Sequence, residues 1–518
     1  MKYPDEWEAG PLPLTFGVEL EMVFGIDMWQ VNDDPKFQYL VPENYDPDPD
    51  DQLNIDDYDP DIDPTSDRLL NLCLAGSILR REGVDLAIKA RPKHGDKILD
   101  RWSLTHEISC KIPQVDWEIN RYTSRSVKDL SFTGIELVSP IMDAPDTKTQ
   151  QGFDCESFQH LETVLEGLRN DLPDTTLPDE SSSSENLPID MPWVFFSNPK
   201  TAGFHVHVGM NHDDDWGPMD IPVKVLQHLA WILVVFEDVI SLLHHPERRG
   251  FWYTEIFGYA ASNRRAFPPP LTPSEMRFGR VKLPLHTCSR GIVYDRVKAF
   301  NNIFRTRDHS ELRRAMSNEP NPHDHGYRNT FVNFANIAPE SGSRHEPIKT
   351  VEFRQHCGTT DANEIKEWVY FITSLTRAAE RKANESCPPQ DCTSDDPQYV
   401  LDRPTDSVLT HAESWKYRNI FESKEKRTMK ELFDLMELPV ERRRYWWAKA
   451  QEYQSPTYEE YWKFGTCSPI CTGYIPRDGV GWEGGEVIEQ PWNDPVDSQA
   501  EATDLVSPIS DVSMDLTD

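Results

Sequence analysis

The sequence predicts an α+β protein in which one face of a β-sheet carries charged side chains and the other face packs against helices. Four short apolar segments between residues 16 and 356 alternate apolar residues with acids, imidazoles or a guanidinium. Side chains in a strand point alternately to the two faces of a sheet, so each segment has one apolar and one polar face. Longer apolar segments with helical spacing, 221–244 and 362–382, supply the helices that would cover the apolar face.

The four polar strand faces together predict a metal and phosphate site. The segments are 16–22, 134–138, 203–209 and 350–356. Removing water from several unpartnered carboxylates costs many kcal/mol, so such a face must be wet or neutralised by cations. Strict alternation gives the following members of the polar faces: Glu19 with Glu21; Glu136; His205 with His207; and Glu352 with Arg354 and His356.

The periodicity of the chain predicts a series of strands and helices that carry these motifs. The apolar helix 221–244 begins with Pro222 in its first turn, where proline is favoured. In chain order the predicted elements are strand 14–24; helix 67–82; strands 85–90, 101–110 and 133–139; helix 156–169; strand 203–209; helices 221–244, 293–304 and 308–316; strands 328–337 and 349–356; and helix 362–382.

The core motifs span most of one long region, which argues for a single large domain with additions. Acidic, Pro- or Ser-rich segments interrupt it and predict loops, because they cannot bury enough apolar surface to order themselves. The predicted organisation is a domain over 1–383 with acidic inserts 31–66 and 171–191, a linker over 384–410, a helical extension over 411–471 and a disordered acidic tail over 472–518.

Composition excludes several classes of partner. Fifty-three basic against 88 acidic residues give a net charge of −35, which disfavours binding to nucleic acid or to anionic membranes. Nine cysteines without repeating spacing predict free thiols in a reducing compartment. The N-terminus lacks an apolar signal core, and the longest apolar run, 229–236, is far shorter than the roughly 20 residues of a membrane span. We therefore expect a soluble cytoplasmic protein, and its oligomeric state stays open.

The residue types on the polar face suit phosphoryl transfer. A transferring phosphoryl group spreads negative charge over its oxygens, which calls for divalent cations held by carboxylates and for a guanidinium such as Arg354. Carboxylates suit Mg²⁺ or Mn²⁺, and an imidazole among them favours Mn²⁺. The chain has no GxxxxGK loop, and no GxGxxG fingerprint follows a predicted strand and opens a helix. Bound ATP would therefore contact the sheet through metal ions.

The order of the four motifs resembles the amidoligase family, within the glutamine synthetase and glutamate–cysteine ligase superfamily of carboxylate–amine ligases. The resemblance covers about residues 14–383. It implies a glutamine synthetase-like, curved, mainly antiparallel sheet backed by helices, and it makes 1–383 the catalytic domain. The motifs are Gly17-Val18-Glu19-Leu20-Glu21, Gly134-Ile135-Glu136-Leu137-Val138-Ser139-Pro140, Gly203-Phe204-His205-Val206-His207-Val208-Gly209 and Thr350-Val351-Glu352-Phe353-Arg354-Gln355-His356.

The resemblance also implies a role for each polar residue. His207 would lie near the nucleotide phosphates and Arg354 would neutralise the phosphoryl group in flight, so both would contact ATP. With Glu352 they form the implied catalytic set. Two further matches are Glu107, where the family usually has Asp and whose role stays in doubt, and Asn333. The implied ligands of two or three divalent ions, Mg²⁺ or Mn²⁺, are Glu19, Glu21, Glu136, His205 and Glu352.

The implied reaction joins a carboxylate to an amine at the expense of ATP. ATP would phosphorylate the carboxylate, and the amine would displace phosphate from the acyl phosphate to give an amide. The partners would be small-molecule or peptide carboxylate and amine substrates, whose identity the sequence does not give. No residue is identified as the base that deprotonates the incoming ammonium.

Two other functions stay open at the level of sequence. In a metal-dependent hydrolase, His205, His207 and a Glu would hold Zn²⁺, although four or more carboxylates exceed such a site. A non-catalytic descendant would bind a metabolite or a protein instead, although all five expected ligand positions are filled. Arginines of the loop 245–292, including Arg248 and Arg264, fit either an anion site or solvated surface charge.

Overall fold

A computed structural model describes the parts of the chain that build the sheet and its helices. The described residues are 11–33, 67–89, 100–119, 122–148, 150–168, 191–197, 202–211, 219–245, 248, 262–267, 296–317, 330–338, 348–385 and 429–453. The predicted inserts beyond residue 33 and over 171–190, the linker beyond residue 385 and the acidic tail all lie outside these residues.

The centre of the structure is one nine-stranded, open sheet. Its main path runs β2-β3-β4-β1-β7-β9-β8, and β5 and β6 both pair with β1. Only β2 and β3 pair in parallel, so the prediction of a mainly antiparallel sheet is confirmed. The strands are β1 (Leu14–Ile26), β2 (Leu86–Lys89), β3 (Trp102–His106), β4 (Ser131–Val138), β5 (Met142–Asp143), β6 (Trp193–Phe196), β7 (Gly203–Met210), β8 (Val332–Asn333) and β9 (Val351–Cys357).

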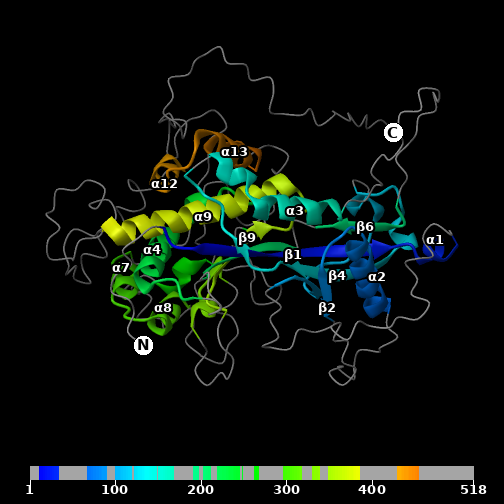
Figure 1. The fold of residues 1–518 in the computed structure, drawn as a ribbon, viewed down its shortest axis with the longest axis horizontal. Coiled ribbons are helices and arrows are strands. Elements are labelled where there is room, and N and C mark those ends of the chain that lie inside the picture. Colours follow the sequence, from blue (N-terminus) through cyan, green and yellow to red (C-terminus); the bar gives the residue numbers. More distant parts are fainter. Residues whose placement is uncertain are drawn as a thin grey trace, which may run out of the picture.

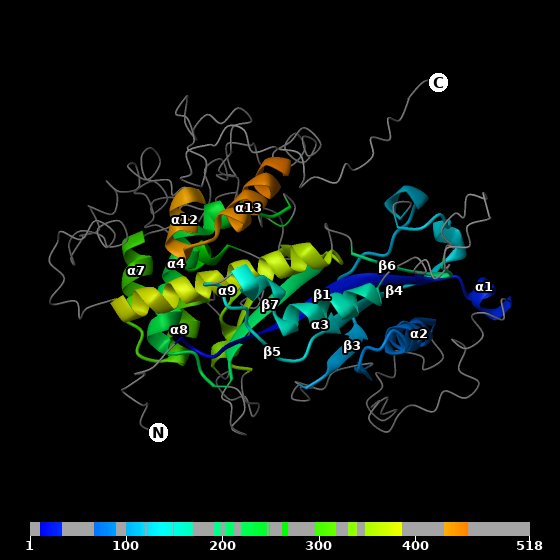
Figure 2. The same ribbon diagram turned by 45° about the horizontal axis from the view of Figure 1, so that its top comes forward.

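Helices cover the apolar face of this sheet, as the alternation predicts. Val18 and Phe204 on that face are at most 1% exposed. Figures 1 and 2 show α9 along the sheet with α12 and α13 on its outer side, and α2 at the end opposite α7 and α8. The α-helices are α1 (Met28–Asp33), α2 (Asp67–Arg81), α3 (Glu156–Glu166), α4 (Val223–Ser241), α7 (Arg296–Phe304), α8 (His309–Met316), α9 (Ala362–Glu385), α12 (Met429–Met436) and α13 (Val440–Glu452).

The register of the strands places the polar motifs in neighbouring rows on the other face. Glu21 lies opposite Glu136, and Glu19 lies opposite His205. One step along the sheet, His207 lies opposite Glu352. Because opposed residues in an antiparallel pair are only about 5 Å apart, the register alone brings these side chains within reach of common ligands.

A β-bulge in β9 corrects one sequence prediction. Phe204 pairs with His356 but Val206 pairs with Phe353, so β9 holds one more residue than β7 over this interval. The extra residue breaks the alternation and turns His356 to the helix-covered face. There its ring contacts the rings of Phe204, His244 and Trp368. The prediction that His356 shares a face with Glu352 and Arg354 is therefore wrong.

The predicted strand 328–337 is also wrong over most of its described length. Only Val332–Asn333 is extended, and a 3-10 turn, η10 (Ala335–Ile337), follows. The side-chain oxygen of Asn333 accepts a hydrogen bond from the backbone N–H of Ala335 at 2.8 Å. This local bond replaces a ladder bond and ends the strand. The short strands β5 and β6 and the helix α1 were not among the predicted elements.

The helical extension shares the core of the sheet domain. Trp446 of α13 is 1% exposed and packs on Trp368 and Phe371 of α9. Leu432 and Phe433 of α12 are fully buried in the same cluster. The rest of the predicted extension, 411–428 and 454–471, lies outside the described residues.

Two compositional expectations can be compared with the described residues. Cys73, Cys110, Cys155 and Cys357 form no disulfide among the described residues, and the reducing compartment stays a prediction. Within the described part of the chain, every helix is too short or too polar to cross a membrane. The compartment stays a prediction.

We predict that His228 of α4 makes folding sensitive to acid. Burial against Phe304 and the charges of Lys224 and Lys382 lower the pKa of His228 to about 4. The unfolded histidine has a pKa of about 6.5, so this part of the stability is present above pH 6.5 and is lost as pH falls toward 4. Replacing His228 with Gln should remove about 2 kcal/mol of this pH dependence.

Urea unfolding of wild type and His228→Gln at about pH 4.5 and about pH 7.5 measures the difference. Comparing the two proteins cancels the titration of the many carboxylates, which is common to both. Equal losses of stability in the two proteins would rule out His228 as a source of acid sensitivity.

Candidate metal and phosphate site

Glu19 on β1 lies at the centre of the polar face. Its two carboxylate oxygens contact His207 Nε2 at 2.9 Å and His205 Nδ1 at 3.0 Å. The other nitrogen of His207 lies 3.0 Å from the hydroxyl of Thr350. Burial opposes ionisation of Glu19, but the charge of His207 and the hydrogen bonds from both imidazoles hold its pKa well below the usual range.

Glu352 on β9 forms a second anchored carboxylate. Asn333 donates its side-chain N–H to Glu352 Oε2 at 2.7 Å, and Arg354 Nη1 donates to Oε1. Burial raises the pKa of Glu352, yet the charges of Arg354, His207 and His205 together hold it below its usual value. The buried Nε of Arg354 has no hydrogen-bond partner among the described residues. A guanidinium with an unused buried donor suits an anionic ligand.

Glu21, Glu107 and Glu136 form a third group of carboxylates. Glu107 follows β3, and its backbone N–H donates to the carbonyl of Gly134 at 3.0 Å. A Cβ at Gly134 would lie 2.0 Å from the carbonyl oxygen of Glu107, so only glycine permits this approach. Burial, and then the charges of Glu19, Glu21 and Glu107, raise the pKa of Glu136 well above its usual range.

These side chains meet in three overlapping groups with the geometry of ligands to a metal ion. Within each group, one ligand atom per residue lies within 4.8 Å of the others. The donor set of carboxylates with imidazole fits Mg²⁺ or Mn²⁺. The raised pKa of Glu136 gives the physical reason for a cation, because burial and the neighbouring carboxylates disfavour its ionisation. The groups are Glu19, Glu136 and His205; Glu19, His207 and Glu352; and Glu21, Glu107 and Glu136.

All predicted site residues therefore lie together on one face. Their roles as ligands stay predictions, since geometry alone does not assign a metal. The structure brings Glu107, whose role the sequence left in doubt, together with the carboxylates of Glu21 and Glu136. It also adds Thr350, which the alternation of its own strand could have placed beside Glu352, because the two are two residues apart.

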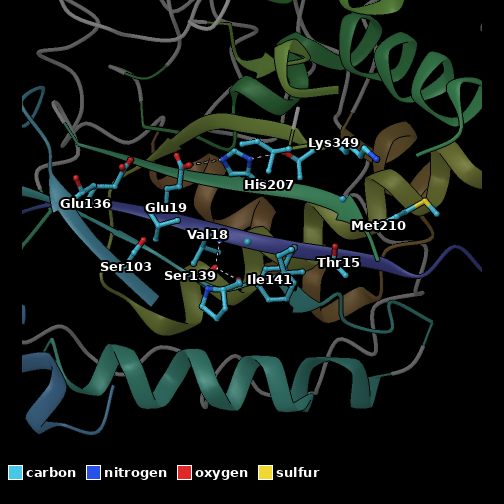
Figure 3. Close-up of a pocket in the computed structure, with 18 of the residues that line it drawn as sticks. Thr15, Val18, Glu19, Ser103, Glu136, Ser139, Ile141, His207, Met210 and Lys349 are labelled. Atoms are coloured by element: carbon cyan, nitrogen blue, oxygen red, sulfur yellow. Dashed lines mark hydrogen bonds and ion pairs between the residues drawn. The ribbon is translucent and has the colours of Figure 1, made fainter. Parts of the chain in front are cut away.

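A cavity of about 260 Å³ opens beside these residues. Figure 3 shows Glu19, Glu136 and His207 pointing to one side of the sheet, with Met210 and Lys349 farther along the wall. Apolar residues such as Val138 and Ile141 line the remainder. The cavity thus combines an anionic, metal-suited floor with an apolar section and lysine side chains.

Lys349 reaches this wall through an unusual backbone conformation. Its φ is +62°, in the left-handed region that non-glycine residues rarely adopt, at a cost of about 1–2 kcal/mol. Its N–H donates to the carbonyl of Asn336 at 2.9 Å, which holds the turn before β9. No sequence signal marks this turn, so the position of Lys349 at the cavity was not predicted.

The strands of the site carry a family signature. Residues 194–376 match the family described as "Putative amidoligase enzyme". The match confirms the predicted resemblance to the amidoligase family over this segment, and it indicates an enzyme of the ligase type. The amidoligase segment runs from β6 to α9 and includes His205, His207, Glu352 and Arg354. No curated protein and no solved structure matches the chain.

The N-terminal strands complete the site of the amidoligase segment. Glu19, Glu21 and Glu136 precede the matched residues, yet β1 lies between β4 and β7 in the same sheet. The ligand groups therefore draw on both parts of the chain.

Two arginines of the loop 245–292 have structural contacts. Arg264 is buried and donates to the carbonyls of Val234 and Val235 at 2.7 and 3.0 Å, so it fits neither predicted role. Arg248 is buried and donates to the carbonyl of Arg354 at 3.0 Å. It thus supports the backbone of the predicted phosphoryl-binding arginine.

We predict that a methyl group at Gly203 disrupts the metal site. A Cβ there would lie 2.5 Å from His205 Nε2 and 3.0 Å from Glu21 Oε2, so both ligands would have to move. Gly203→Ala should weaken Mn²⁺ binding by about tenfold or more, as displacement of metal-supporting groups does elsewhere. Isothermal titration calorimetry with Mn²⁺ measures the affinity.

Gly17→Ala is the matched control on the same sheet face. Its Cβ would meet Ser139 Oγ at 3.6 Å, which is ordinary contact, so Mn²⁺ affinity should be unchanged. Equal affinities for the two variants would contradict the assignment of Glu21 and His205 as ligands.

Proposed function

We propose that the protein is an ATP-dependent carboxylate–amine ligase with a glutamine synthetase-like catalytic domain. It forms an amide bond through an acyl phosphate. The observation that carries this proposal is the convergence of five glutamates, two imidazoles and Arg354 on one sheet face, in overlapping ligand groups. The amidoligase match of the segment that holds half of these residues supports the same reaction class.

Mg²⁺ or Mn²⁺ would be held by Glu19, Glu21, Glu136, His205 and Glu352, with Glu107 beside them. When bound, these ions neutralise phosphate oxygens and favour attack on phosphorus. The chain's own contribution is to orient the carboxylates. Asn333 fixes Glu352, and the two imidazoles fix Glu19.

The cavity beside His207 is the proposed nucleotide site. Its apolar section, with Met210 and Ile141, suits a purine base, while Lys349 and His207 suit phosphate oxygens. His207 already bonds Glu19 and Thr350, so its ring is held in one orientation at the floor of the cavity. The nucleotide would thus extend from the apolar section toward the carboxylates.

Arg354 would stabilise the group that is transferred. Its Nη1 is held by Glu352, while its buried Nε has no partner in the described residues and can donate to a phosphoryl oxygen. A substrate carboxylate oxygen attacks the γ-phosphorus, and the bond from that phosphorus to the ADP oxygen breaks. The amine nitrogen then attacks the acyl carbon and phosphate leaves with the carboxylate oxygen. The reaction releases ADP, phosphate, amide and one proton.

The described contacts weigh against the two alternatives. A zinc hydrolase needs three protein ligands and an open position, whereas both imidazoles here pair with Glu19 inside a field of five carboxylates. A non-catalytic descendant would have no need to keep the Asn333–Glu352–Arg354 arrangement. The reaction test distinguishes all three.

We predict that the protein transfers oxygen from a carboxylate to phosphate. An amide that is missing from the metabolites of cells without the protein would identify the carboxylate and amine substrates. The carboxylate substrate is then labelled with ¹⁸O and incubated with the protein, ATP and Mg²⁺. The label should appear in phosphate only when the amine is also present. Arg354→Gln should lower this rate by about 100-fold or more, because it removes charge stabilisation at the phosphoryl group.

Arg307→Gln is the control, since it removes an exposed ion pair with Glu311 on α8, away from the site. Unlabelled phosphate with ADP formed would contradict the acyl phosphate. Zinc-dependent amide hydrolysis without ATP would support the hydrolase, and a folded protein that does not bind nucleotide would support the non-catalytic descendant.

A further inference from the structure

We propose that the C-terminal helix α13 positions strand β9, with Lys449 as the positioning residue. A segment outside the amidoligase match would then be part of the support of the active site. This inference rests on the proposed function for the roles of Glu352 and Arg354. The contacts that carry it join α13, the start of α9 and the end of β9.

Two ion pairs fasten α13 to α9, on either side of a buried tryptophan. Arg442 pairs with Glu367, and Lys449 Nζ lies 3.1 Å from Glu364 Oε1. Between them Trp446 packs on α9. The two pairs are alike in chemistry and join the same two helices, which lie side by side in Figure 2, so they allow a matched comparison.

Of these two pairs, the Lys449 pair continues into β9. Glu364 Oε1 lies 3.8 Å from His356 Nε2, and Glu364 Oε2 accepts a hydrogen bond from Thr359 at 2.9 Å. His356 belongs to β9, and Thr359 lies in the turn that joins β9 to α9. Lys449 therefore neutralises the carboxylate that holds the turn after β9 through Thr359 and lies beside the ring of His356.

The held part of β9 is the part that orients Arg354. The bulge lies between Phe353 and His356, and it allows Arg354 to point to the polar face while His356 points to the helices. If His356 were not fixed, a regular strand without the bulge would compete with the observed pairing of β9. The ion pair from α13 thus favours the register in which Arg354 reaches Glu352.

The same turn is linked through Ser197 to the strand that carries Glu21. The N–H of Gly358 donates to the carbonyl of Ala202 at 2.8 Å, and a Cβ at Gly358 would lie 1.9 Å from Ser197 Oγ. Ser197 Oγ in turn donates to the carbonyl of Glu21 at 2.7 Å. A shift of the turn would therefore reach two proposed ligand strands, because packed groups transmit displacement.

The test compares Lys449→Met with Arg442→Met. Lys449→Met should weaken Mn²⁺ binding to the full chain by about tenfold, at the low end of the effect of outer-shell groups on metal affinity. Lys449→Arg, which keeps the charge, should bind Mn²⁺ as wild type does. Arg442→Met should lower the thermal midpoint but leave Mn²⁺ affinity unchanged, because among the described residues Glu367 pairs with α13 and not with β9.

Each outcome decides the inference. If Lys449→Met binds Mn²⁺ as tightly as wild type, or if both variants weaken binding alike, α13 is only a packing element. If wild type does not bind Mn²⁺, the proposed function fails and this inference fails with it. Should a single variant not fold, the neutral pairs Glu364→Gln with Lys449→Met and Glu367→Gln with Arg442→Met give the same comparison.

Discussion

The structure depends on the compensation of negative charge on one face of a single sheet. Five glutamate side chains meet there, and their charges are compensated unequally. The imidazoles of His205 and His207 hold the pKa of Glu19 low and, with Arg354, that of Glu352, whereas burial and the neighbouring carboxylates raise the pKa of Glu136. The face is therefore neutralised at one end and short of positive charge at the other. This imbalance, rather than the number of acids, is what a divalent cation would relieve.

The fold makes this concentration of charge tolerable by separating it from the core. Alternation along β1, β7 and β9 sends every second side chain into a helix-covered layer, so the same strands that crowd the acids also supply the apolar burial that stabilises the protein. Two local exceptions tune the arrangement. Gly134 permits the chain carrying Glu107 to approach β4, and the bulge in β9 allows Arg354 and His356 to face opposite sides.

Sequence reasoning located the polar face because a period of two is a local property. It placed Glu19, Glu21, His205 and His207 on common faces, which the register then aligned. It failed where contacts with another segment of the same chain determine the local structure. The bulge that turns His356 depends on pairing with β7, and the contacts of Arg264 depend on carbonyls of α4. The end of β8 depends on a side chain, Asn333, that bonds the following backbone instead of extending the ladder.

This architecture explains which segments of the chain supply which polar side chains. The amidoligase segment supplies the imidazoles and the arginine strand, but the carboxylates that leave the face anionic come from β1 and β4 before it. Helices that pack on the apolar face of a strand restrain its register. They therefore also restrain the positions of the side chains on the polar face. By this argument, elements as distant in sequence as α13 would bear on Arg354 without approaching the proposed ligands. In such a protein the boundary of the candidate site is set by which helices hold the strands, and the family match alone does not mark it.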